Sequence, residues 1–286
     1  MVVLHYVVNM SYARAPVLLG AYVAAPSDFP VWHLDQAHGI LSTPAIRLMH
    51  WPLLPPVPSW IPPNKSGEQM DAIVRTLLQR RHMDTESVQE LARALTPVGM
   101  QVVATMHHAS ISPSHLLQPE ASQAAASFFA STARVLIHLG VPLKYVEIWR
   151  HPNMKLKPGA DERKVNAQVV DLATGYGKLA IATRRMLRER APGVGLVGPA
   201  PSDWRSNQSL SQWRSLLRAL PPSALDAHDV WQMPWPGSHA ELRDSTSFFR
   251  SLLSFATLAR TEDSLQDAPR AASALAASAL AAADAS

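Results

Sequence analysis

Short apolar segments alternate with longer segments of helical period along most of the chain. The apolar segments lie at residues 17–24, 45–51, 101–107, 145–149 and 194–200, with a weaker one at 224–231. Apolar residues at helical spacing mark residues 84–96, 120–139 and 162–190. Such alternation is typical of βαβ units, in which helices connect parallel strands. The pattern therefore predicts an α/β fold with a parallel sheet.

The two ends of the chain leave the number of strands open. Residues 255–262 could form a seventh strand or continue the preceding helix, and periodicity does not decide between the two. From Arg270 the chain is a nearly featureless alanine-rich run, so no eighth strand is visible there. Either the sheet lacks a strand at its C-terminal end, or residues 1–8 supply one.

Composition and charge favour one large soluble domain rather than a membrane or nucleic-acid-binding protein. Proline and tryptophan are frequent, which suggests many structured loops. The net charge is +4, but the basic residues are scattered, so a nucleic-acid partner is not supported. No segment has the uninterrupted length of a membrane span, and the first residues lack the positive region of a signal peptide. The compartment stays open, and a secreted or trimmed protein is compatible with the sequence.

Several kinds of chemistry are excluded by what the sequence lacks. Cysteine is absent, which removes disulfides, thiolate catalysis and cysteine metal ligands. There is no glycine-rich dinucleotide-binding run and no P-loop, so we expect no cofactor. A serine nucleophile elbow is also missing.

The most informative segment spans residues 144–153 and reads KYVEIWRHPN. It resembles the end of the fourth barrel strand in clan A glycoside hydrolases, particularly family 39, in which the corresponding sequence is close to EIWNEPN. Residues 188–200, RERAPGVGLVGPA, are similar to that family's passage into the fifth strand. The positions that agree in the first motif are Glu147, Ile148, Trp149, Pro152 and Asn153.

This resemblance implies both a fold and a class of ligand. The fold is a (β/α)8 TIM barrel over residues 1–269, incomplete at the C-terminal end unless residues 1–8 contribute, with residues 270–286 as an alanine-rich tail. The class is that of retaining glycosidases similar to β-xylosidases and α-iduronidases. The expected ligand is a carbohydrate, either a polysaccharide or a smaller glycoside.

The motif departs from the family where the chemistry matters most. The family's acid/base glutamate is replaced by His151, and the asparagine that holds the substrate's 2-hydroxyl is replaced by Arg150. Retaining glycosidases need two carboxyl groups roughly 5 Å apart. A histidine can shuttle protons, but its protonated form would add positive charge beside a cationic transition state. The sequence therefore leaves open a rewired hydrolase, with His151 as the altered catalytic group, and a carbohydrate-binding pseudoenzyme.

The carboxylates of the chain suggest two further assignments. Glu147 lies deeper along its strand than His151, so we expect a buried structural carboxylate paired with Arg47 of the second predicted strand. In the family the nucleophile follows a threonine at the end of the seventh strand, and Thr261 with Glu262 is the matching pair here. Glu262 is therefore the candidate nucleophile, and an exposed glutamate at a helix end is the alternative.

Aromatic and histidine side chains gather near the predicted carboxyl ends of strands, where barrel enzymes bind their substrates. Indole rings pack on the C–H faces of sugars, although any single tryptophan can also be a packing residue. The expected substrate-binding residues are Arg150, Asn153, Trp149, His107, Trp51, Trp204, Trp231 and Trp235. A metal-dependent barrel hydrolase is the alternative, with no metal expected otherwise. Its ligands would be His107, His108, His151 and His228.

Overall fold

The computed structural model describes ten stretches of the chain. They are residues 4–9, 17–22, 46–51, 65–80, 85–96, 101–105, 113–149, 152, 162–200 and 206–234. Contacts divide the chain into two units, Met1–Gly237 and Ser238–Ser286, and every described residue belongs to the first. The predicted strand at 255–262, the boundary at 269 and the tail at 270–286 lie outside the described residues and stay predictions.

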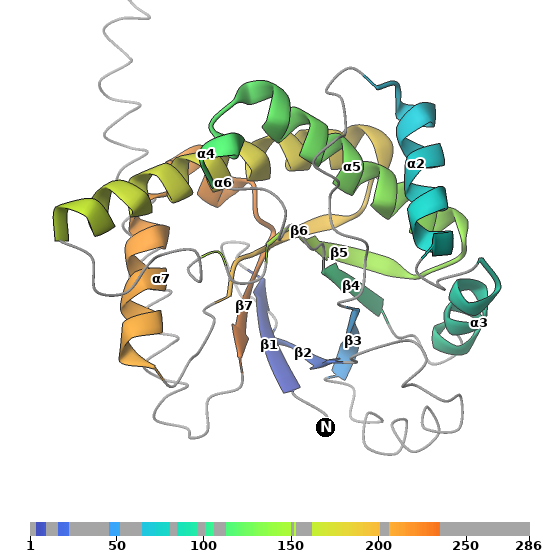
Figure 1. Ribbon diagram of the computed structural model, residues 1–286. Helices are drawn as coiled ribbons and strands as arrows, with labels where there is room; N and C mark the ends of the chain where they lie inside the picture. Colours follow the sequence, from blue (N-terminus) through green and yellow to red (C-terminus); the bar gives the residue numbers. More distant parts are fainter. Residues whose placement is uncertain are drawn as a thin grey trace, which may run out of the picture. The chain divides into compact units, whose positions relative to one another are not determined.

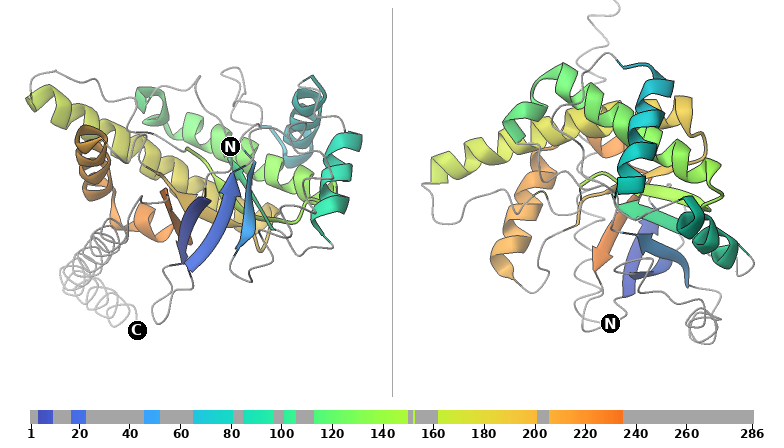
Figure 2. Two further views of the ribbon diagram at one scale, coloured as in Figure 1. Left: turned by 90° about the horizontal axis from the view of Figure 1, so that it is seen from below. Right: turned by 45° about the vertical axis from the view of Figure 1, so that its right-hand side comes forward.

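The strands of the described part are hydrogen-bonded in chain order, and β1 also pairs with β7, so the sheet closes on itself. Neighbouring strands from β2 to β7 run parallel, whereas β1 runs antiparallel to both of its neighbours. Figure 2 shows β1, β2 and β3 next to one another in blue. The bounds are β1 Leu4–Asn9, β2 Val17–Tyr22, β3 Ile46–Trp51, β4 Gln101–Thr105, β5 Leu143–Glu147, β6 Gly195–Gly198 and β7 Val230–Pro234.

The predicted α/β class with a parallel sheet is confirmed by these strands. The first residues do supply a strand, β1, which was one of the two possibilities that the sequence left open. Its antiparallel direction was not predicted, because a repeat of βαβ units leads to expect parallel neighbours only. The weak strand expected at 224–231 was placed too early, since β7 begins at Val230 and Pro222–Asp226 is helical. The cause is local, because Pro222 stands at the first helical turn, where its missing N–H costs nothing.

The described helices include α3, α5 and α6, which confirm the three helical segments predicted from apolar spacing. Helix α2 was not predicted. Helices α2, α5 and α6 lie side by side on one side of the strands (Figure 1). None of the helices in the described part combines the length and the hydropathy needed for a membrane span. The bounds are α2 Gly67–Arg80, α3 Thr85–Leu95, α4 Pro113–Leu116, α5 Pro119–His138, α6 Glu162–Arg190, α7 Asn207–Ala219 and α8 Pro222–Asp226.

Side-chain and glycine caps explain where several helices begin and end. Before α2, the Ser66 hydroxyl accepts a hydrogen bond from the Gln69 N–H, and the Gln69 side chain accepts one from the Ser66 N–H. This reciprocal pair is a capping box. Helix α5 ends at His138, and the chain turns away at Gly140, whose φ of 87° favours glycine. The N–H of the next residue, Val141, donates to the Leu136 carbonyl and so caps the helix.

Two close approaches on β6 require residues without side chains. A Cβ at Gly195 would overlap the ring of Tyr145 on β5, and a Cβ at Gly198 would overlap the indole of Trp231 on β7. The Tyr145 side chain forms a buried apolar cluster with Val103, Val197 and Val230. The two glycines of β6 therefore let aromatic rings of both neighbouring strands approach its backbone closely.

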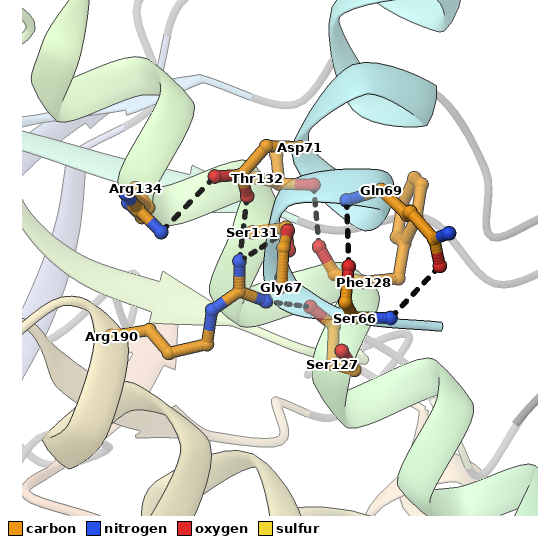
Figure 3. A network of polar contacts seen from close by, with 10 residues as sticks. All are labelled: Ser66, Gly67, Gln69, Asp71, Ser127, Phe128, Ser131, Thr132, Arg134 and Arg190. Carbon is orange, nitrogen blue, oxygen red and sulfur yellow. Dashed lines mark hydrogen bonds and ion pairs between the residues drawn. The ribbon is translucent and has the colours of Figure 1, made fainter. Parts of the chain in front are cut away.

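A single arginine links three helices. Arg190, the last residue of α6, donates to the Gly67 carbonyl at 2.8 Å and to the Asp71 carboxylate at 2.7 Å, both on α2. Its other terminal nitrogen donates to Ser131 on α5. Asp71 also forms an ion pair with Arg134 of α5, at 3.3 Å (Figure 3). The Arg190 and Asp71 side chains are only 12% and 14% exposed, so this pair is shielded from water.

We expect Arg190→Gln to lower the free energy of unfolding by about 3 kcal/mol, because it leaves a nearly buried carboxylate without its main partner. Urea denaturation followed by circular dichroism measures the change. Arg185→Gln on the same helix is the matched control, since Arg185 is exposed, and its effect should stay within about 0.5 kcal/mol. Equal losses in the two variants would contradict the assigned role of Arg190.

Candidate functional site

The EIW motif falls at the carboxyl end of β5. Glu147 is the last residue of the strand, and Ile148 and Trp149 follow it directly. Glu147 is fully buried, and its Oε2 accepts a hydrogen bond of 2.8 Å from the Thr105 hydroxyl. The two residues face each other in the pairing of β4 with β5. The carboxylate is thus held by the neighbouring strand. The predicted pairing with Arg47 stays a prediction, because the Arg47 side chain lies outside the described part.

Behind the motif, aromatic rings form a continuous buried series between β5, α6 and β7. The Trp149 and Tyr176 ring centroids are 6.5 Å apart, those of Tyr176 and His228 are 5.7 Å apart, and those of His228 and Trp231 are 4.8 Å apart. Trp149 is 8% exposed and Trp231 is 1% exposed. In this arrangement both indoles pack within the protein, and their roles in sugar binding stay predictions.

The polar centre of this series is a hydrogen bond between Tyr176 on α6 and His228, just before β7. The His228 Nδ1 lies 2.7 Å from the Ala224 carbonyl, which can only accept, so this nitrogen carries the proton. In the neutral ring, Nε2 then accepts a hydrogen bond from the Tyr176 hydroxyl, at 2.9 Å. Both ring nitrogens of His228 are therefore occupied by protein groups.

Burial keeps this pair uncharged. It lowers the pKa of His228 to about 4, although hydrogen bonds to the Ala224 and Leu225 carbonyls favour the protonated form, and the nearby Arg184 charge lowers it a little further. Burial also raises the pKa of the Tyr176 hydroxyl well above its usual value, and the charge of Glu147 adds to this rise. A neutral histidine and a protonated tyrosine are the stable forms across the ordinary pH range.

The predicted site residues are only partly covered by the described stretches. Trp149 and Trp231 are brought into the same ring series, and Trp51 ends β3 opposite Ala104, with its side chain outside the described part. The roles of the remaining residues stay predictions. Those outside the described residues are His107, His108, Arg150, His151, Asn153, Trp204, Trp235 and Glu262.

One of the four histidines of the metal alternative, His228, has both ring nitrogens bonded to protein groups in this conformation. A metal-ligating histidine needs a free ring nitrogen, and His228 has none. Within the described ranges, no three histidine, aspartate or glutamate side chains gather as a metal site would require. The other three histidines of that alternative lie outside these ranges.

Sequence reasoning missed the partners rather than the motif. Thr105 ends a strand that was predicted, but nothing in the sequence marks it as the partner of Glu147, 42 residues away. Tyr176 sits among the apolar positions of a predicted helix and reads as an ordinary core residue. The only available signal was the pair of adjacent polar residues, His228 and Asp229, at the start of an apolar strand.

Comparison with known proteins gives structural likeness alone. No protein-family model and no curated protein matches the sequence. Virulence factor SghA from Agrobacterium tumefaciens aligns with 13% identity and a TM-score of 0.33, over 68% of this chain and 44% of that one. Its complex with the substrate analog salicin aligns with 12% identity and a TM-score of 0.33, over 68% of this chain and 43% of that one. A beta-glucosidase from Thermotoga maritima, in complex with a substituted glucoimidazole, aligns with 13% identity and a TM-score of 0.32, over 62% of this chain and 42% of that one. The chain thus spans less than half the length of these structures, and a likeness at this level assigns neither fold nor activity.

The buried His228 predicts a loss of stability in acid. Its pKa is about 4 in the folded protein and about 6.5 in the unfolded chain, so protonation favours unfolding. The stabilisation is complete above about pH 6.5 and is lost as the pH falls towards 4, a change on the order of 3 kcal/mol. We expect His228→Gln to flatten this part of the pH dependence, measured by urea denaturation between pH 7.5 and 4.5.

The matched control is His138→Gln, because His138 is an exposed histidine at the end of α5. It should leave the pH dependence unchanged. The assignment fails if the two variants show the same slope of unfolding free energy against pH.

Proposed function

We propose that this chain is a glycoside-hydrolase-like protein that binds or acts on a polysaccharide or glycoside at the carboxyl end of β5. The observation that carries the proposal is that Glu147, Ile148 and Trp149, three residues of the family motif, occupy the end of a parallel strand and the positions directly after it. In barrel enzymes this edge of the sheet holds the active site. A motif match in that context is stronger than the match of the letters alone.

We further propose that the sheet is a variant of the (β/α)8 TIM barrel. The strand order in the described part follows the chain and closes through β1, which is the connectivity that a barrel needs. Because β1 already pairs with β7, the ring closes without the segment at 255–262, and we propose this segment as the one that carries the nucleophile, Glu262. With β1 antiparallel to its neighbours, the amino-terminal side of the barrel departs from the regular repeat.

The altered motif governs what chemistry the proposed site performs. Glu147 is bonded to Thr105 and fully buried, so it is unsuited to deliver a proton to a leaving group. The acid/base position is then His151, beside Arg150. Arg150 favours the neutral imidazole, which accepts a proton or binds a hydroxyl better than it protonates a glycosidic oxygen. The proposed activity is therefore carbohydrate binding with weak or rewired hydrolysis.

The test restores the family pair with Arg150→Asn and His151→Glu in one chain. We expect hydrolysis of xylo-oligosaccharides to rise by roughly 10²–10⁴-fold, because a carboxyl would then protonate the leaving group. The gain on 4-nitrophenyl β-xyloside should be smaller, since a nitrophenolate leaves with little protonation. Initial rates on both substrates measure the effect.

His138→Glu, an exposed histidine changed in the same way on α5, is the matched control and should leave both rates unchanged. If the wild type hydrolyses xylo-oligosaccharides well and His151→Ala keeps that rate, the acid has been assigned to the wrong residue. If the restored protein is inert but still binds the oligosaccharide in calorimetry, the pseudoenzyme form of the proposal holds. Inertness without binding would overturn the carbohydrate function.

A further inference from the structure

A pocket of about 570 Å³ opens at the amino ends of β5, β6 and β7, the edge of the sheet opposite the motif. Lys144 and Tyr145 reach it from the start of β5, and Asp229 from the residue before β7. Arg184 and Arg188, one turn apart near the end of α6, line another side. The turn at residues 192–195 completes the wall. Four separate elements of the fold thus contribute to the pocket.

The lining of this pocket has an excess of positive charge. Three cationic side chains face one carboxylate, and that carboxylate is already occupied. Asp229 accepts from Arg184 at 2.5 Å through one oxygen and from the Leu196 N–H at 2.7 Å through the other. Asp229 therefore balances Arg184, and the charges of Lys144 and Arg188 remain.

Neither of these two cations is paired with a described residue. The ion pairs within the described part involve other arginines, and no described side chain or carbonyl bonds Lys144 or Arg188. Arg184, by contrast, bonds to Asp229 and, at 3.5 Å, to the Val194 carbonyl, so the cationic side chains of the pocket wall that lack a partner among the described residues are Lys144 and Arg188. Such unpaired donors around a cavity favour an anionic ligand over a neutral one.

Tyr145 adds a neutral donor to the wall. Burial raises the pKa of its hydroxyl, and the Asp229 charge raises it further, so the phenol keeps its proton. Pro192 and Val194 supply apolar contact beside the charged groups. The volume exceeds that of a bare phosphate and falls in the range of pockets that hold small organic ligands.

We propose that this pocket binds a small molecule carrying a phosphate or sulfate group, with Lys144 and Arg188 as its principal charged contacts. Arginine offers a planar pair of donors that matches two oxyanion oxygens, and lysine adds a point charge. The organic part of the ligand would lie against the turn at 192–195. This pocket is separate from the proposed carbohydrate site, and its test does not depend on hydrolysis.

The test measures binding of inorganic phosphate to the full chain by isothermal titration calorimetry at pH 7.5 and low salt. We expect saturable binding in the wild type and roughly 10-fold weaker binding in Arg188→Gln and in Lys144→Gln. The double variant should show no saturable binding. Phenyl phosphate and phenyl sulfate form a second arm, which shows whether the site prefers the doubly or the singly charged ester.

Arg185→Gln is the matched control, because it removes the same charge from a neighbouring turn of α6 without lining the pocket. It should change the dissociation constant by less than about 2-fold, as expected for a screened surface charge. Circular dichroism confirms that all variants are folded. The proposal is overturned if the wild type shows no saturable binding of any of the three probes, or if Arg185→Gln weakens binding as much as Arg188→Gln does.

Discussion

The position of α6 depends on the Arg190 guanidinium, and both proposed sites depend on α6. Arg190 bonds to Gly67 and Asp71 on α2 and to Ser131 on α5, so one side chain at the end of a long helix holds it against two others. A charge this well shielded from water must be paired, which makes other placements of the helix costly. The rest of α6 can then carry side chains whose hydrogen bonds to groups at the strands need accurate placement of the helix.

Those side chains form two polar contacts between α6 and the strands. In one, Tyr176 bonds to His228, and in the other Arg184 bonds to Asp229, which also accepts from the β6 backbone. The Tyr176–His228 contact is buried and uncharged, whereas Arg184 and Asp229 form an ion pair whose side chains are 22% and 32% exposed. Directional bonds of this kind fix the register of a helix on a sheet better than apolar contact does, because a shift by one turn would leave buried groups unpaired.

Periodicity and local chemistry predict part of this fold, and the prediction fails where distant residues decide. Helices α3, α5 and α6 were predicted from their apolar spacing, whereas α2 was not, although its buried residues Met70, Val74 and Leu78 also recur at helical spacing. The predicted strand begins too early, at residue 224, because Ala224 and Leu225 are apolar, although Pro222 starts a helix there and β7 begins only at Val230. The EIW motif was found by resemblance. Its partner Thr105, the Tyr176–His228 bond and the Arg190 contacts to residue 71 join residues 42 to 119 positions apart, and no local pattern encodes such pairs.

Strand β5 connects the two proposed sites and also keeps them apart. Lys144 stands near its amino end and Trp149 just past its carboxyl end, and five residues of extended chain span roughly 16 Å. This separation is about twice the screening length of roughly 8 Å at physiological salt. Water and salt at the surface therefore screen most of the interaction between a ligand charge at the proposed anion pocket and charged groups at the proposed carbohydrate site. His228 lines the pocket and bonds to Tyr176, and both side chains are uncharged, so this contact between the pocket and the ring series behind the motif carries no charge. The two proposals, anion binding at one edge and carbohydrate binding at the other, can therefore be tested by separate substitutions.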